Sequence, residues 1–127
     1  MRGIIDTSVF IALEQGRPVD AAQLPEDAAV SVVTLVELEV GVHLAADATQ
    51  RGFRARSLRD VADRFHVLPV DTVGRLSFAE IAAQARRAGR KAAPQDTWIA
   101  ATARVHGVAV YTQDADFDHL DVHVARV

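Results

Sequence analysis

Five short segments of the sequence have the apolar or alternating pattern that is typical of strands. They comprise residues 3–5, 28–33, 66–70, 108–111 and 121–127. The segment 108–111, VAVY, is continuously apolar, which predicts a strand that is buried on both faces. Proline cannot donate a hydrogen bond to a neighbouring strand, so Pro69 predicts that segment 66–70 lies at a sheet edge or ends there.

Segments with helical signals lie between these strands. They run from Thr7 to near Gly16, from Thr34 through Leu44, from Gln50 to Phe65, from Asp71 toward Ala88, and from Asp96 to Gly107. In the third segment, apolar residues recur at 58, 61, 62 and 65, the spacing of one buried helix face. Strands that alternate with helices predict a three-layer α/β/α sandwich with a central, mainly parallel sheet. We expect residues 1–127 to form a single domain of this kind.

Composition narrows the class of protein. Half of the 127 residues are apolar, which argues against disorder. The chain has no cysteine, which excludes a disulfide framework, a zinc–thiolate site or a catalytic thiol and agrees with a reducing cytoplasm. It begins directly with a short strand, MRGIID, and no apolar run approaches the length of a membrane span. We therefore expect a cytoplasmic protein with no membrane partner.

Four acidic residues occupy equivalent places in this pattern. Asp6 follows the first strand, Glu37 lies in the first turn after the second, Asp96 opens a helix, and Asp114 follows the strand 108–111. The carboxyl ends of parallel strands share one edge, where α/β proteins form their sites, so these side chains can meet there. Carboxylates packed together raise one another's pKa values, and a divalent cation offsets that repulsion.

The type of ligand indicates which cation and which reaction. Oxygen ligands without cysteine or paired histidine favour Mg²⁺ or Mn²⁺ over zinc. Such an ion lowers the pKa of a bound water and stabilises charge on a phosphodiester, so the chemistry implied is metal-assisted hydrolysis of a phosphate ester. The five histidines form no HxH or HExxH pair, and we expect no role for them.

Each acid also has an ordinary structural explanation. Asp6 and Asp96 can serve as helix caps. Thr34 and Glu37 have the spacing of a capping box, in which Glu37 reaches back to the Thr34 backbone. Asp114, like Asp116 two residues later, can form a turn by bonding its local backbone. The functional interpretation depends on their joint placement at one edge.

These residues together resemble the signature of PIN domains. The matching motifs are Asp6-Thr7-Ser8, Thr34-x-x-Glu37-Leu38-x-x-Gly41, Asp96-x-x-Ile99-Ala100-Ala101-x-Ala103 and Thr112-x-Asp114-x-Asp116-Phe117. The resemblance covers essentially the whole chain, and it is closest to the VapC-type toxin ribonucleases of bacterial type II toxin–antitoxin pairs. It implies a metal-dependent endoribonuclease that cuts RNA, commonly tRNA or ribosomal RNA. It also implies a homodimer and a VapB-like antitoxin that occupies the active-site groove.

The resemblance implies roles for individual residues. Mg²⁺ or Mn²⁺ would be held by Asp6, Glu37, Asp96 and Asp114, with Asp116 as an additional carboxylate. Glu37 would orient the attacking water or complete the metal shell. Thr7 and Thr112 would supply supporting hydroxyls near the metal. The basic residues before Asp96 are the candidates for contacts with the RNA backbone: Arg86, Arg87, Arg90 and Lys91.

Other functions remain open at this point. A PIN-like domain that no longer cleaves would bind RNA or a partner protein, although the acidic set has no departure from the family pattern. A receiver domain would need a lysine after a late strand, yet the only lysine is Lys91, ahead of a helix. A phosphatase with an aspartyl nucleophile would need a second aspartate two residues after Asp6, where Ser8 stands.

Overall fold

A parallel sheet forms the centre of the molecule. The structure is a computed structural model that describes residues 2–127, and within them the strands form one five-stranded sheet in the order β3-β2-β1-β4-β5. The strands are β1 (Arg2–Ile5), β2 (Asp27–Ser31), β3 (His66–Leu68), β4 (Ala109–Thr112) and β5 (Val124–Arg126). All four strand pairs are parallel, with Ile4 opposite Ala29 on one side and Val110 on the other. The predicted α/β class is confirmed.

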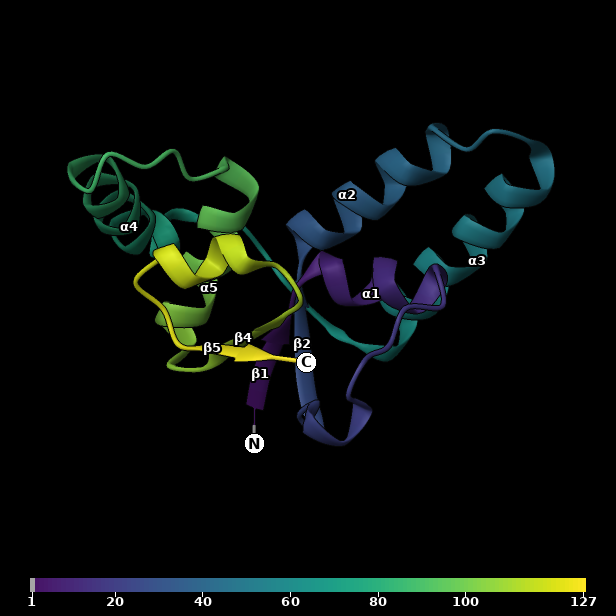
Figure 1. Ribbon diagram of the computed structural model, residues 1–127, viewed down its shortest axis with the longest axis horizontal. Coiled ribbons are helices and arrows are strands. Elements are labelled where there is room, and N and C mark those ends of the chain that lie inside the picture. The colour runs from purple at the N-terminus through teal and green to yellow at the C-terminus, as the bar shows by residue number, and fades with distance from the viewer. Residues whose placement is uncertain (1) are drawn as a thin grey trace.

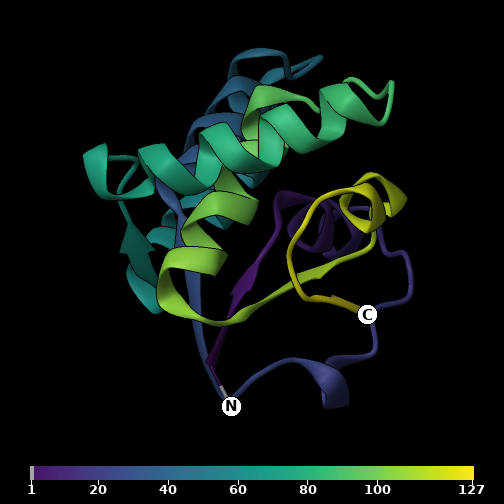
Figure 2. The same ribbon diagram turned by 90° about the vertical axis from the view of Figure 1, so that its left-hand side faces the viewer.

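Helices cover both faces of this sheet (Figures 1 and 2). They are α1 (Thr7–Glu14), α2 (Val32–His43), α3 (Ala48–Arg64), α4 (Arg75–Arg87) and α5 (Pro94–His106), with short 3-10 turns η1 (Ala21–Gln23), η2 (Thr72–Gly74) and η3 (Ala115–His119). Helices α1 and α3 pack on one face, while α4 and α5 pack on the other and lie toward the viewer in Figure 2. This arrangement is the predicted three-layer sandwich.

Two separate cores follow from the alternation of side chains along each strand. On β1, Ile4 joins the core under α4 and α5, whereas Ile5 joins the core under α1 and α3. On β4, Val110 and Tyr111 divide in the same way. Successive residues of a strand point to opposite faces, so a strand covered on both sides must be apolar throughout. These four side chains are at most 3% exposed, as predicted for a strand buried on both faces.

The boundary between the second strand and the helix that follows it was predicted two residues too late. Val32 and Val33 belong to α2, because Ser31 caps that helix by accepting a hydrogen bond from the Val33 N–H. Their β-branched side chains favour a strand, but packing and the serine cap override this weak preference. Glu37 therefore lies in the second turn of α2, and Thr34 is not its cap.

Three other predictions need smaller corrections. Asp71 caps the 3-10 turn η2, and α4 begins only at Arg75. The last strand is three residues long instead of seven. Helix α5 begins at Pro94, which suits the first helical position because its missing N–H is not needed there. Asp96 thus lies within the first turn and does not cap the helix.

The ends of two elements were predicted correctly for physical reasons. Gly107 ends α5 in the left-handed conformation, with φ of 65°, which a residue without Cβ adopts at little cost. Pro69 immediately follows β3, an edge strand, so its missing N–H disrupts no ladder. Among residues 2–127, no helix combines the length and the apolar character that crossing a bilayer requires.

Candidate active site

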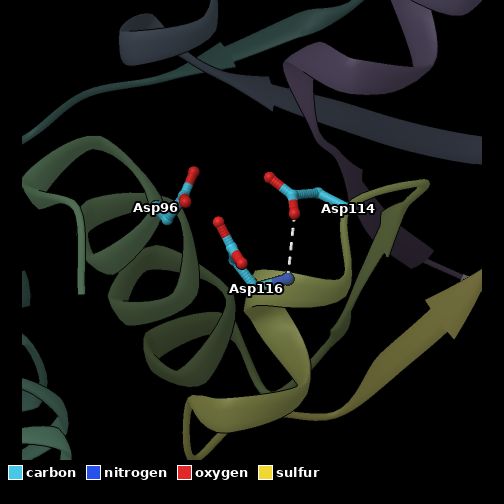
Figure 3. Close-up of side chains that lie close together, drawn as sticks. All are labelled: Asp96, Asp114 and Asp116. Atoms are coloured by element: carbon cyan, nitrogen blue, oxygen red, sulfur yellow. Dashed lines mark hydrogen bonds between the residues drawn. The ribbon is translucent and has the colours of Figure 1, made fainter. Parts of the chain in front are cut away.

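Three carboxylates converge beyond the carboxyl end of β4. Asp96 comes from the first turn of α5, Asp114 directly precedes η3, and Asp116 lies within η3. Each offers an oxygen, and these three oxygens lie within 4.8 Å of one another. Figure 3 shows their side chains directed toward a common space, with the Asp116 N–H donating to Asp114 Oδ1 at 2.9 Å. We refer to Asp96, Asp114 and Asp116 as the carboxylate cluster.

Asp6 is fixed beside this cluster by hydroxyl groups. Its side chain caps α1 by accepting a bond from the Ser8 N–H. The hydroxyls of Ser8 and Thr112 also donate to Asp6 Oδ2, at 2.7 and 2.9 Å. Asp6 is only 3% exposed, and these donors hold its carboxyl group in one orientation. Asp6 therefore performs the predicted capping role and still carries a buried negative charge at the site.

Thr112 connects two of the acids. Its hydroxyl donates to Asp6 and accepts a hydrogen bond from the Asp114 N–H at 2.9 Å. The hydroxyl of Ser8, in contact with Thr112 at 3.1 Å, also accepts a bond from the Gln113 N–H. The turn after β4 is thereby tied to the start of α1, which fixes the position of Asp114 relative to Asp6.

Glu37 is positioned from α2 by a second hydroxyl. Thr7 Oγ1 lies 2.8 Å from Glu37 Oε1 and 3.0 Å from the hydroxyl of the buried Thr34. Burial raises the pKa of Glu37, the hydrogen bond from Thr7 lowers it in part, and the charge of Asp6 raises it further. Within residues 2–127, neither Asp6 nor Glu37 joins the set of mutually close oxygens.

The charges of these acids act together on Asp96. The pKa of Asp96 is raised to about 7, chiefly by burial and then, in descending order, by the charges of Asp6, Asp114, Glu37 and Asp116. A carboxylate with such a pKa is poorly stabilised by the protein alone. An oxygen-only set of close, mutually repelling carboxylates fits a hard divalent cation, and Asp96, Asp114 and Asp116 are the residues placed to hold it.

The supporting residues were only partly predicted. Thr7 and Thr112, expected as supporting hydroxyls, contact Glu37 and Asp6 respectively. Sequence reasoning missed the hydroxyls of Ser8 and Thr34. The signal for Ser8 was present, because a residue two positions after a capping aspartate is placed to bond its carboxylate. For Thr34 there was no local signal, since its partner is 27 residues away.

The four basic candidates lie in different places. Arg86 and Arg87 end α4, and Arg87 lines a depression together with Glu80, Arg104 and Asp121. Arg90 and Lys91 instead line a hollow together with Asp96 and Asp116. The structure therefore brings only the second pair beside the carboxylate cluster.

Known proteins resemble this chain over nearly its full length. The family model described as PIN domain matches residues 4–122. Ribonuclease VapC5 of Mycobacterium tuberculosis is 44% identical, with 98% of this chain and 95% of that protein aligned. The solved structure of VapBC-5 from the same organism covers 99% of this chain and 97% of that one, with a TM-score of 0.87 and 40% identity. The solved structure of FitAcB from Neisseria gonorrhoeae covers 96% of this chain and 95% of that one, with a TM-score of 0.78 and 29% identity.

Proposed function

Because this chain belongs to the PIN domain family, we propose that it is a metal-dependent endoribonuclease toxin that a VapB-like antitoxin neutralises. The observation that supports this most strongly is the carboxylate cluster, in which Asp96 has a pKa raised to about 7. Similarity to Ribonuclease VapC5 supports RNA as the substrate, with tRNA or ribosomal RNA as the expected target. We place this activity in the cytoplasm.

The divalent cation would be Mg²⁺ or Mn²⁺, held by Asp96, Asp114 and Asp116 with Asp6 close by. When bound, it supplies an activated water at neutral pH and stabilises negative charge on the phosphate oxygens. The hydroxyls of Ser8 and Thr112 hold the Asp6 carboxyl group in place, and the charge of Asp6, which also acts on Asp96, favours cation binding. At or above pH 7, Asp96 loses its proton readily, as a ligand must.

Glu37 has the properties of a residue that orients the attacking water. Thr7 holds its Oε1, while its Oε2 has no hydrogen bond to any residue in the range 2–127. Burial raises its pKa, which makes its carboxylate a better acceptor for a proton of water. The Thr7 bond fixes the direction in which that free oxygen can act.

The proposed antitoxin would lie over an apolar groove that reaches the site. This groove, between α1, α2 and α3, has a volume of about 490 Å³ and is lined by Phe10, Leu13, Leu38, Phe53 and Glu37 among others. Glu37 is thus shared by the groove and the acidic site. The similar protein VapBC-5 is a member of a family of toxin–antitoxin systems, which supports a protein partner of this kind.

We also propose a homodimer. Val36 and Val40 on α2 are 58% and 50% exposed and line a shallow hollow with Trp98. Burying such side chains against a second copy removes apolar surface from water. Sedimentation of the purified protein should give the mass of a dimer, and Val40→Glu should shift it to a monomer. A monomeric mass for the unaltered protein would contradict the proposal.

Mapping RNA 5′ ends after brief induction tests the proposed activity. New ends should accumulate at defined sites with the unaltered protein and be absent with Asp6→Ala. In vitro, cleavage should require Mg²⁺ or Mn²⁺ and be lost on chelation, with Asp6→Ala slower by roughly 10³-fold. Near-normal cleavage by Asp6→Ala would contradict the assignment. RNA binding with no metal-dependent cleavage by the unaltered protein would favour the alternative, a PIN-like binding module.

A further inference from the structure

A second hollow adjoins the carboxylate cluster on the side of α4 and η3. It has a volume of about 270 Å³. Arg90 and Lys91, just after α4, and His119, at the end of η3, line it together with Asp96 and Asp116. We refer to it as the basic hollow. Two of the three clustered carboxylates therefore share a wall with two cations and an imidazole.

The side chains of Arg90, Lys91 and His119 in the basic hollow have no partners among the residues that the structure describes. Among residues 2–127, no side-chain hydrogen bond or ion pair involves Arg90, Lys91 or His119, although two carboxylates line the same space. Elsewhere on the surface, Arg104 and Arg126 are paired with carboxylates. The donors of the basic hollow are therefore free to contact a ligand.

The walls of the basic hollow combine three kinds of surface. Arg90 and Lys91 supply charge for a phosphate, and the planes of Arg90 and His119 can stack on a base. Buried Ala85 and Leu120 add apolar surface against which a base or ribose can pack. Recognition of single-stranded RNA uses this combination of stacking on aromatic or guanidinium planes and charge on the backbone.

Continuity with the carboxylate cluster determines which part of the RNA would enter. A phosphodiester bound through the proposed cation beside Asp96, Asp114 and Asp116 would have its adjoining nucleotide next to Asp96 or Asp116, and both residues line the basic hollow. On the Glu37 side, the neighbouring surface is the apolar groove. Near Gln113, the guanidinium of Arg17 is already engaged with Gln15 and Gln113. In the basic hollow, unpaired cations thus line the same space as two of the clustered carboxylates.

We propose that the basic hollow is a subsite for the nucleotide on one side of the cleaved phosphodiester. His119 stacks on its base and sets a base preference there, while Arg90 and Lys91 hold its phosphate. This inference rests on the proposed function, because it assumes that RNA is bound and cut at the carboxylate cluster. It assigns a role to His119 that the sequence did not suggest.

The test uses a single-stranded RNA oligonucleotide that carries a cut site found by 5′-end mapping, and a series in which each flanking base is replaced in turn. His119→Ala should raise KM on the order of tenfold with little change in kcat, because one stacking contact is lost. It should also abolish the base preference at one position beside the cut and leave the other side unchanged. His119→Phe, which keeps a planar ring, should retain that preference.

The cations have a separate readout. The double variant Arg90→Ala/Lys91→Ala should weaken binding and reduce the slope of log affinity against log salt by roughly 0.7 for each lost phosphate contact. His123→Ala and Arg59→Ala are matched controls, because these residues are exposed and do not line the basic hollow. Neither control should alter KM, salt slope or base preference. Circular dichroism of each variant checks that the fold is retained.

Failure of the subsite and failure of the proposed function are distinguishable. If the unaltered protein cuts RNA with Mg²⁺ or Mn²⁺ while the His119 and Arg90/Lys91 variants keep its KM, salt slope and base preference, the subsite alone is overturned. If the unaltered protein cuts no RNA under these conditions, the proposed function is wrong and the subsite falls with it. A matching rise in KM and a matching loss of base preference in the controls also overturn the subsite.

Discussion

The two hollows beside the active site each contain an arginine, and the two arginines differ in their partners: Arg54 lines the apolar groove and Arg90 lines the basic hollow. In the apolar groove, Arg54 donates to Glu14 at 2.8 Å and to the Gly41 carbonyl at 2.8 Å, so this guanidinium is satisfied within the protein. In the basic hollow, Arg90 and Lys91 have no such partners among residues 2–127. Polar groups that are paired internally contribute to folding, whereas unpaired ones beside a site are available to a ligand. Substitutions in the two regions should therefore affect different properties.

The largest expected effect comes from placing a charge in the apolar groove. Leu13 is 56% exposed and lines the groove, so Leu13→Arg should leave folding and RNA cleavage nearly unchanged. It should weaken binding of the proposed antitoxin by roughly 100-fold, because a buried apolar contact is replaced by a charge that must lose its water. Isothermal titration calorimetry measures this loss.

Leu76→Arg is the matched control for this substitution. Leu76 is 67% exposed on α4 and lies outside the groove, so antitoxin affinity should stay unchanged. Equal affinities for the Leu13 and Leu76 variants would show that the groove is not the antitoxin site.

A smaller effect is expected on stability, where replacing Arg54 and replacing Arg90 should change the free energy of unfolding by different amounts. Arg54→Ala leaves the half-buried Glu14 without its partner and frees the Gly41 carbonyl, which should lower the free energy of unfolding by about 2 kcal/mol. Arg90→Ala removes an unpaired, exposed side chain and should change the free energy of unfolding by less than about 0.5 kcal/mol. Urea unfolding followed by circular dichroism gives both values. Similar losses for the two variants would remove the distinction between the regions.

The smallest expected effect concerns the pH dependence of stability. The folded state raises the pKa of Asp96 from 3.8 to about 7, so between these values it binds more protons than the unfolded state. The stability of the metal-free protein should therefore fall as pH rises from about 4 to about 7. Because Asp96 is only partly buried, solvent screening reduces its contribution to the change in the free energy of unfolding to about 1 kcal/mol.

Asp96→Asn removes that titration. In the metal-free state the variant should be more stable than the unaltered protein above pH 7, and the difference should vanish below about pH 4. Added Mn²⁺ should stabilise the unaltered protein more than the variant, because binding to the folded state adds to its stability. Melting curves across pH, with and without Mn²⁺, give both comparisons. A variant that is less stable in metal-free buffer at pH 8 would contradict the electrostatic account of the cluster.

Much of the fold was predictable because its signals are local. The apolar strands, the glycine at the end of α5 and the proline after β3 all act over a few residues, and the resemblance to the PIN family was confirmed. The errors fell where local signals conflict. Val32 and Val33 favour a strand by their side chains, yet the cap at Ser31 begins a helix there.

The sequence predicted that several acids lie near one another at this edge, but it did not predict the distances between them. Asp6 and Asp114 each cap a local element and also lie at the shared edge, so the structural explanation is confirmed and the functional one stays a prediction. Asp116, expected as an additional carboxylate, lies in the tight cluster with Asp96 and Asp114. Glu37 is separated from that cluster and bonded to Thr7. Direct metal ligation by Asp6 and Glu37 stays a prediction.

The sequence by itself determined which strands are buried, that they are parallel, and hence that acids after several strands meet at one edge. Those conclusions depend on side-chain periodicity and on connections of fixed handedness, which are properties of neighbouring residues. Only the tertiary structure decided that Arg90, Lys91 and His119 share a hollow with Asp96 while Arg87 does not. Distances between residues far apart in the chain are set by packing across the whole core, and no local pattern encodes them.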